Sequence, residues 1–360
     1  MGDHPRFTLP VGLCEPMTEC EFCFCKSGQP HHDKCPVVNQ TVEKKINGLR
    51  HGTLLDHGRY RVGMTLNHGG FGIAYICKDN KYNRRVVVKE FFPNGYAARN
   101  IDESNEVSYS KISSDALFMM QEQFYREYDI MTKAAGPGIP GVYGFFYENN
   151  SSYIAMDFIE GITFKNYLLN QKKKPNWKML TKKFFIPLLG IVNTVHSKGL
   201  LHRDISLVNL MITPEEKIVL LDFGAGRDFH EKETVEKLRF ANKMYAPIEQ
   251  TQPEHGFRQG PWTDIFALGT VFYIAITGQY PPMATERPQK AVSSAITYVP
   301  DLPAPYDDAL LKSLYYYPQY RFQSISAFES ALTACLKKSP LQISGKPVIS
   351  DMIRKILTPR

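Results

Sequence analysis

Two polar motifs in the second half of the sequence contain residue types that suit phosphoryl transfer. His202-Arg203-Asp204 is followed by Asn209, and Asp222-Phe223-Gly224 comes shortly afterwards. Asp204 can accept the proton of an attacking hydroxyl group. Asn209 and Asp222 offer the hard oxygen ligands that Mg²⁺ prefers when it bridges phosphates. Because both motifs rarely occur in this order and spacing by chance, they predict chemistry on a magnesium-bound polyphosphate.

A glycine-rich turn and two charged residues in the first half could hold the same phosphates. The turn 68–72 contains Gly69, Gly70 and Gly72, and glycine lets backbone N–H groups approach a phosphate closely. Lys89 ends a strand-like run and could reach the phosphates, while Glu127 could orient Lys89 by ion pairing. Each feature also has an ordinary interpretation: a plain hairpin, a strand end that reaches water, or a solvated helix charge.

The residue pattern of the sequence changes near Tyr60, where the strands and helices that must position these residues are predicted to begin. Runs rich in β-branched residues predict strands, and apolar residues at helical spacing predict helices. The predicted strands are 60–66, 73–77, 85–89, 142–147 and 153–158, with short strand pairs within 209–222. Residues 93–115 are polar and are predicted to be loop. The predicted helices are 116–135, 164–170, 180–197, 262–278 and 324–336. A strand-rich part therefore precedes a helix-rich part.

Composition excludes several classes of protein. The chain has 360 residues, of which 43% are apolar and 22% charged, which is typical of a globular protein with about two structural units. Its longest apolar stretches have about 12 residues, so no membrane span is expected, because a span needs ~20 residues. No secretory signal is recognised at the N-terminus, so we expect a cytoplasmic protein. The net charge of +7 comes without aromatic platforms, so nucleic-acid binding is not expected.

Cysteine is concentrated near the N-terminus. Five of the seven cysteines lie within residues 14–35, and Cys20 and Cys23 have the spacing of half a zinc knuckle. In a reducing compartment such a cluster indicates metal binding before disulfide formation. His31, His32 and Cys35 could complete four ligands with Cys20 and Cys23, and Cys14 or Cys25 could compete for these places. The set that we favour for zinc is Cys20, Cys23, Cys35 and Cys14. The alternative is a flexible or redox-active tail.

Taken together, the motifs resemble the protein kinase superfamily from roughly residue 59 to 336. Residues 156–161 resemble the gatekeeper and hinge, Ala246-Pro247-Ile248-Glu249 resembles the end of an activation segment, and 264–269 resembles the large buried helix of the second lobe. Arg321 occupies the position at which the family pairs an arginine with the glutamate corresponding to Glu249. The sequence is similar to that of bacterial eukaryotic-like Ser/Thr kinases at residues 89–93, 202–206, 245–250 and 260–264. Such kinases often carry an N-terminal motif that resembles a zinc ribbon.

The resemblance implies an α+β, two-lobed protein kinase fold. A β-rich N-lobe at 59–157 and a helical C-lobe at 161–336 would form the kinase domain, with ATP bound between them. A Cys/His-rich segment at 1–50 would precede it, and a tail at 337–360 would follow it. The implied cofactors are ATP and Mg²⁺ or Mn²⁺, together with Zn²⁺ at the cysteines.

The resemblance also assigns roles to particular residues. The implied catalytic residues are Lys89, Glu127, Asp204, Asn209 and Asp222, of which Asn209 and Asp222 would hold Mg²⁺. The implied nucleotide-binding residues are Asn67, Gly69, Gly70, Gly72, Ala74, Val87, Lys89, Met156, Asp157, Phe158 and Met211. Met131, His202 and Phe223 match the hydrophobic stack that aligns the lobes in the active state.

Some positions depart from the family pattern. Asn67 replaces the first glycine of the turn, and a left-handed backbone there would suit asparagine. Ser206 replaces a lysine that usually lies near the γ-phosphate, and Lys243 is a candidate substitute. Arg203 could receive a phosphorylated residue of the activation segment, where Thr234 is favoured over Tyr245.

Three functions fit these residues to different degrees. The favoured one is an ATP- and Mg-dependent protein kinase that transfers the γ-phosphate to Ser/Thr of protein substrates and phosphorylates itself. A kinase-fold scaffold, or pseudokinase, would bind a partner protein without catalysis. A small-molecule kinase of the aminoglycoside type would lack the long activation segment. The sequence leaves open the substrate, the activating signal and the oligomeric state.

Overall fold

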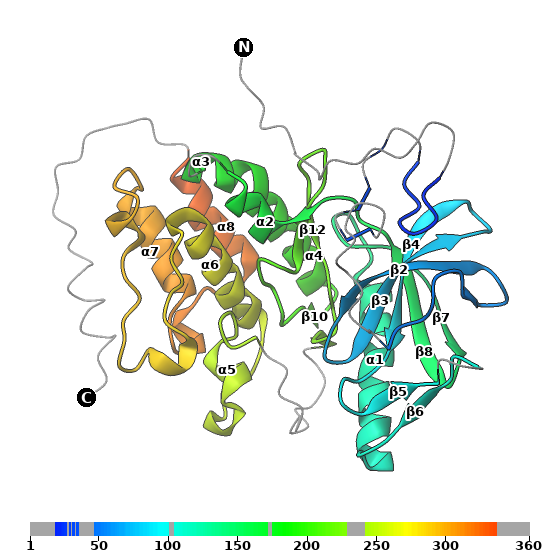
Figure 1. The fold of residues 1–360 in the computed structure, drawn as a ribbon. Helices are drawn as coiled ribbons and strands as arrows, with labels where there is room; N and C mark the ends of the chain where they lie inside the picture. The colour runs from blue at the N-terminus through cyan, green and yellow to red at the C-terminus, as the bar shows by residue number, and fades with distance from the viewer. Residues whose placement is uncertain are drawn as a thin grey trace. The chain divides into compact units, whose positions relative to one another are not determined.

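The computed structural model describes residues 19–26, 29, 31–32, 34–35, 47–100, 104–171, 175–228 and 242–336. The chain divides into two units (Figure 1). The first unit comprises residues up to Ala135 together with Pro140–Ile159, and the second comprises Gly136–Ile139 together with residues from Glu160 onward. Among the helices of the described ranges, none combines the length and the apolar character needed to cross a bilayer.

An antiparallel sheet of six strands forms the centre of the first unit, in the order β1-β2-β3-β4-β8-β7 (Figure 1). The strands are β1 (Leu54–Leu55), β2 (Tyr60–His68), β3 (Gly72–Asp79), β4 (Arg84–Phe91), β7 (Val142–Glu148) and β8 (Ser151–Asp157). Alternate residues of β4 point to opposite faces. Val86 and Val88 therefore join Tyr60 and Tyr75 in the buried core of one face, whereas Lys89 points to the other. The predicted strands of this unit are confirmed.

Helix α1 (Ser114–Ala134) is the long helix of the first unit. It begins two residues before its predicted start, because the Ser113 hydroxyl accepts a hydrogen bond from the backbone N–H of Ala116 at 3.3 Å and caps the first turn. The Phe124 ring packs against Phe91 of β4, with 5.6 Å between ring centroids. This contact fixes α1 against the sheet on the face to which Lys89 points.

The prediction that residues 93–115 are loop is wrong in part. They contain a hairpin of two short strands, β5 (Ala97–Arg99) and β6 (Val107–Tyr109), which pair with each other. Three-residue strands are too short to show an alternating pattern in the sequence. The Arg99 guanidinium, which is buried, forms an ion pair with the Glu90 carboxylate, and this contact ties the hairpin to the sheet.

Glu90 is a fully buried carboxylate whose charge is compensated from three sides. Besides Arg99, the hydroxyl groups of Tyr75 and Tyr153 each donate a hydrogen bond to it at 2.6 Å. Burial, together with the neighbouring charge of Glu90, raises the pKa of both tyrosines well above the usual range. Lys89 and Glu90 are adjacent, so the strand presents one to α1 and the other to this polar network in the core.

The second unit is mainly helical. Its helices are α2 (Phe164–Leu169), α3 (Trp177–Leu180), η1 (Thr181–Phe185), α4 (Ile186–Ser197), α5 (Ile248–Thr251), η2 (Pro253–His255), α6 (Pro261–Thr277), η3 (Ala284–Glu286), η4 (Ala295–Thr297), α7 (Ala304–Ser313), η5 (Pro318–Tyr320) and α8 (Ile325–Ala334). Its strands are β9 (Ile162–Thr163), β10 (Leu200–Leu201), β11 (Leu210–Ile212), β12 (Ile218–Leu220) and β13 (Arg227–Asp228). They form the sheets β12-β11-β9 and β10-β13. The predicted helices are present, whereas α5 and α7 were not predicted.

Helix α6 is apolar on nearly all sides and forms the core of the second unit (Figure 1). Its Phe272 ring stacks on Phe185 with 3.9 Å between centroids. A β-carbon added at Gly269 would lie 2.0 Å from the Ser313 hydroxyl oxygen and 2.9 Å from the Ser313 Cβ. Close packing of α6 against α7 therefore requires glycine at this position.

A single π-helical turn, η1, joins α3 to α4. The backbone N–H of Ile186 donates to the carbonyl oxygen of Thr181, five residues earlier, instead of four. Pro187 follows directly and has no N–H, and in a regular helix its ring would clash with the carbonyl of Lys183. The wider turn accommodates this proline with one extra residue.

Candidate active site

Lys89 and Glu127 form the ion pair that the sequence suggested. The Lys89 Nζ atom lies 2.6 Å and 2.7 Å from the two carboxylate oxygens of Glu127. Glu127 is on the buried side of α1 with 4% of its surface exposed. Because β4 and α1 are packed together through Phe91 and Phe124, the ammonium group is held in one place within the first unit.

The glycine-rich turn closes between β2 and β3. The backbone N–H of Gly69 donates to the Gly72 carbonyl at 2.8 Å, and nothing lies within 4 Å of a β-carbon built at Gly70. A β-carbon at Gly72 would come within 2.3 Å of the Glu90 carbonyl, so only glycine fits there. Asn67 belongs to β2, pairs with Ala74 and has no left-handed backbone. The strand extends through Asn67, so its tolerance of positive φ is not used.

Of the residues implied to contact the base, Ala74, Val87 and Met156 lie on neighbouring strands of the first unit, whereas Met211 lies on β11 of the second unit. Ala74 pairs with Lys89 across β3 and β4, and Val87 pairs with Met156 across β4 and β8. The Asp157 side chain accepts hydrogen bonds from the backbone N–H of Gly141 at 2.7 Å and from the hydroxyl of Tyr143. This carboxylate is therefore committed to the structure of the sheet edge.

Asp204, Asn209 and Asp222 come close together in the second unit through short loops. The Asn209 amide nitrogen donates to the Asp204 carboxylate at 2.8 Å and to its carbonyl at 2.9 Å. The amide oxygen of Asn209 is then the atom available to a hard cation. The backbone N–H of Leu221 donates to the Asn209 carbonyl at 2.8 Å, which places Asp222 next to it in the fold. This donor set fits Mg²⁺.

Asp264 of α6 holds the backbone of the loop that carries Asp204. Its two oxygens accept hydrogen bonds from the N–H groups of His202 at 2.9 Å and Arg203 at 2.7 Å, and from the His196 ring at 2.8 Å. Burial opposes ionisation of Asp264, but the hydrogen bond and charge of His196 outweigh it, so the pKa of this carboxyl stays below its usual range. Arg203 needs this support because its φ is 68°.

His202 is fully buried between this loop and the second motif. Its ring lies against Phe223 with 4.5 Å between centroids, and its Nε2 is 3.0 Å from the Leu221 carbonyl. Burial lowers the pKa of His202, so the ring stays neutral and donates this hydrogen bond at neutral pH. His202 and Phe223 thus contact each other, as their place in the hydrophobic stack implied.

The ion pair expected between Glu249 and Arg321 is present and fully buried. The two nitrogens Nη1 and Nη2 of Arg321 lie 2.7 Å and 3.1 Å from the Glu249 oxygens. The remaining guanidinium N–H groups donate to the carbonyls of Tyr315, Tyr316 and Trp262. All five donors of the guanidinium are satisfied, which is why the charges can be buried.

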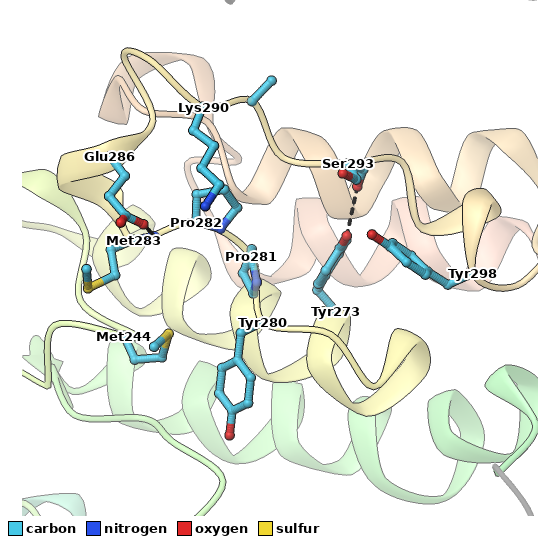
Figure 2. A pocket seen from close by; sticks show the side chains of 11 residues that line it. Met244, Tyr273, Tyr280, Pro281, Pro282, Met283, Glu286, Lys290, Ser293 and Tyr298 are labelled. Atoms are coloured by element: carbon cyan, nitrogen blue, oxygen red, sulfur yellow. Dashed lines mark hydrogen bonds between the residues drawn. The ribbon is translucent and has the colours of Figure 1, made fainter.

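A pocket of about 510 Å³ lies beside Met244, which precedes Glu249 by five residues in the sequence (Figure 2). The aromatic rings of Tyr273, Tyr280 and Tyr298 line it, as does the ammonium group of Lys290. Figure 2 shows the Tyr273 hydroxyl donating to the Ser293 carbonyl at 2.9 Å, which fixes one wall. None of the implied catalytic residues lines this pocket.

The cysteine cluster is a compact set of metal-ligating atoms. The ligand atoms of Cys20, Cys23, His31 and Cys35 all lie within 4.8 Å of one another, and the four residues are buried. The Cys20 and Cys35 sulfurs are 3.7 Å apart, and His31 Nδ1 is 3.4 Å and 3.5 Å from the sulfurs of Cys23 and Cys35. A tetrahedral zinc site has S···S edges of about 3.8 Å and S···N edges of about 3.5 Å. The cluster therefore fits zinc.

Among the described residues, His31 is the fourth member of the group with Cys20, Cys23 and Cys35, as the sequence allowed. Cys14 lies outside the described residues, and Cys25 offers a fourth sulfur 3.5 Å from the same His31 nitrogen. Burial raises the pKa of the Cys23 thiol, but hydrogen bonds from the backbone of His32 and Cys25 and from the His31 ring lower it to about 6. A thiol with this pKa ionises readily, as a metal ligand must.

Comparison with known proteins decides the family. A protein-family model described as "Protein kinase domain" matches residues 60–342. The chain belongs to the protein kinase family. Its α+β fold, with a strand-rich and a helical unit, is the kinase fold that the motifs implied. A solved structure described as "PpkA-294 apo form" superposes with a TM-score of 0.67 at 30% identity, covering 80% of this chain and all of that chain.

Several curated relatives of this kinase domain come from bacteria, as the sequence motifs suggested. The serine/threonine-protein kinase PknA of Nostoc sp. is 28% identical over 294 residues, covering 78% of this chain and 47% of PknA. PknD of Chlamydia trachomatis serovar D is 25% identical over 318 residues, covering 78% of this chain and 32% of PknD. The chain thus spans half or less of the length of these relatives. The kinase domain of Mycobacterium tuberculosis PknI, at 21% identity and a TM-score of 0.60, shows the shared fold.

The structure describes most of the residues that depart from the family pattern or that were considered as phosphorylation sites. Ser206 is fully buried, and its hydroxyl oxygen has no hydrogen-bond partner among the described residues. Lys243, the suggested substitute for the missing lysine, is exposed. Tyr245 is largely buried and burial raises its pKa well above the usual range, in keeping with the packed end of the segment. Thr234, the favoured phosphorylation site, lies outside the described residues.

Proposed function

We propose that this chain is an ATP- and Mg-dependent protein kinase that phosphorylates Ser or Thr of protein substrates and also itself. The observation that carries the proposal is the ion pair of Lys89 with both oxygens of Glu127. The names of the bacterial relatives support the Ser/Thr class. The boundaries 59–336 for the kinase domain, 1–50 for the N-terminal segment and 337–360 for the tail, and a cytoplasmic location, belong to the same proposal.

The residues would divide the chemistry among them. Lys89, oriented by Glu127, would bind the α- and β-phosphates, and the turn with Gly69, Gly70 and Gly72 would cover them through backbone N–H groups. Asn209 and Asp222 would hold Mg²⁺, which neutralises charge on the phosphates. Asp204, fixed by Asn209, would orient the acceptor hydroxyl and take its proton. The base would lie against the nucleotide-binding set of Asn67, Ala74, Val87, Met156, Asp157, Phe158 and Met211.

Transfer of phosphate from γ-labelled ATP tests the proposal. Wild-type protein with Mg²⁺ should label itself and a generic basic protein, on Ser or Thr. The variant Asp222→Asn should lose the label while staying folded, and Asp129→Asn, at an exposed ion pair of α1, serves as the matched control. Label on Tyr would show that the acceptor residue is Tyr and not Ser or Thr. Failure of the wild type to transfer phosphate, despite binding Mg-ATP, would favour the scaffold function.

We further propose that Cys20, Cys23, His31 and Cys35 bind one Zn²⁺. The support is that one S···S and two S···N separations in the cluster match the edges of a zinc tetrahedron. The purified protein should contain one equivalent of zinc, and Cys35→Ser should lose it. Cys25→Ser should keep it, because four other donors remain. If Cys35→Ser keeps its zinc and Cys25→Ser loses it, the zinc ligand is Cys25 and not Cys35.

A further inference from the structure

The cysteine cluster shares a hydrophobic core with the sheet of the first unit. Cys20, Cys23 and Cys35 are buried together with Met64 of β2 and Ile76 of β3. At Gly63 of β2, an added β-carbon would lie 2.1 Å from the Phe22 carbonyl oxygen and 2.6 Å from the Phe24 ring. The backbone of the cysteine segment therefore lies directly on β2, and glycine at 63 is what permits this approach.

Polar contacts connect the same segment to the sheet at its edges. The Lys34 ammonium group donates to the Leu66 carbonyl of β2, and the Glu19 carboxylate forms an ion pair with Lys78 of β3. The His32 ring lies 6.4 Å from the Phe158 ring, measured between centroids. The segment thus contacts β2, β3 and the residue that follows β8.

Several of these contacts are next to residues that we propose to bind the nucleotide. Ile76 lies two residues from Ala74, so both side chains are on the same face of β3, about 7 Å apart along the strand. Ile76 also pairs with Val87 across β3 and β4. Leu66 precedes Asn67 in β2, and Phe158 is itself in the proposed nucleotide-binding set. The cluster therefore packs against strands that carry members of that set.

We propose that the Cys₃His cluster, with zinc bound, holds β2, β3 and Phe158 in the arrangement that binds the nucleotide base. Loss of zinc removes the cross-link between residues 20–23 and 31–35, so the segment can no longer keep its shape against Met64 and Ile76. Nucleotide affinity then becomes dependent on zinc and on the reduced state of the cysteines. This proposal rests on the proposed nucleotide binding and on the proposed zinc site.

Binding of Mg·ADP, measured by calorimetry alongside zinc content, tests the coupling. Wild-type protein stripped with a strong zinc chelator, and the variant Cys35→Ser, should bind Mg·ADP at least about fivefold more weakly than the zinc-loaded protein, a change at the lower end of typical couplings between sites. Gly63→Ala keeps every proposed ligand but pushes the segment away from β2. It should keep its zinc and still bind the nucleotide more weakly. Gly144→Ala, in β7 with open space around it, is the matched control and should change neither.

Hydrogen exchange separates this proposal from the kinase proposal. Removal of zinc should accelerate amide exchange in residues 60–68 and 73–79, in addition to the cysteine segment. If only residues 19–35 exchange faster and Mg·ADP affinity stays the same, the coupling is refuted while the kinase activity stands. If the wild type binds no nucleotide, the kinase proposal fails, and exchange in β2 and β3 still decides whether the cluster supports the sheet. Lys34→Ala, a milder change than Gly63→Ala, should show the same direction if Gly63→Ala does not fold.

Discussion

Neutralising Glu249 should strongly destabilise the second unit. Both members of the Glu249–Arg321 pair have fully buried side chains. Glu249→Gln keeps the size of the side chain and the hydrogen bond from Thr263, but it leaves the guanidinium charge buried without a counter-ion. Breaking a buried pair in this way costs about 3–5 kcal/mol of unfolding free energy. For a unit of this size, that corresponds to a fall in melting temperature of about 6–20 °C.

Tryptophan fluorescence during urea unfolding measures this change selectively. The chain has two tryptophans, Trp177 and Trp262, and both belong to the second unit. Excitation at the red edge of the spectrum therefore reports on that unit alone. The matched control is Glu216→Gln, which breaks a partly exposed pair with Lys183 and should change the unfolding free energy by less than about 1 kcal/mol.

A double-mutant cycle shows whether the reasoning is right. Arg321→Met alone leaves Glu249 charged and unpaired, so it should also be strongly destabilising. In the double variant Glu249→Gln/Arg321→Met no buried charge remains, and the loss should be smaller than the sum of the single losses by about 2 kcal/mol or more. Additive losses, or a loss below about 1 kcal/mol for Glu249→Gln, would show that the pair is not compensated as the geometry indicates.

Three more perturbations have defined outcomes. Glu127→Gln should leave the fold intact but slow phosphate transfer by about 100-fold, because Lys89 is no longer held in place; an unchanged kcat would contradict this. The folded pKa of His202 lies below its unfolded value of about 6.5, so stability should fall as the pH drops below about 6.5, by at most about 1.4 kcal/mol per pH unit from this residue. Urea unfolding of His202→Phe should lack this slope, and an equal slope would exclude His202 as its cause. Gly269→Ala should lower the free energy of unfolding by about 1–3 kcal/mol, because the added methyl group overpacks the core. Gly190→Ala, at an open helical position, should raise the free energy of unfolding by about 0.5–1 kcal/mol. Thermal melts that rank the two variants the other way would refute the packing argument.

Much of the kinase unit could be predicted because its signals are local. The strands at β2, β3 and β4 follow β-branched runs, and the motif residues Asp204 and Asn209 have their spacing fixed by one short loop. The Glu249–Arg321 pair is 72 residues apart in sequence and could be expected only from the family resemblance. Its contact in the structure confirms that expectation.

Features that depend on distant contacts escaped prediction. The β5–β6 hairpin is held through the ion pair of Arg99 with Glu90, which no periodicity can reveal. The sequence offered several residues to complete the metal cluster, and the place of His31 beside Cys20, Cys23 and Cys35 depends on how the chain folds over β2 and β3. Asparagine at position 67 would tolerate a left-handed backbone, but Asn67 pairs with Ala74 across β2 and β3 and its backbone is not left-handed.

The π-helical turn η1 gives a one-residue insertion or deletion a defined meaning in this fold. Removing one residue within Thr181–Phe185 would restore regular winding and keep the turns on both sides in register, because the π-helical turn holds the extra residue locally. The buried Trp177, whose indole donates to Asp301 at 3.2 Å and packs on Tyr306, would keep its direction. Pro187 would then clash with the carbonyl group four residues before it. An alignment that places its gap in this turn should therefore also show another residue in place of the proline.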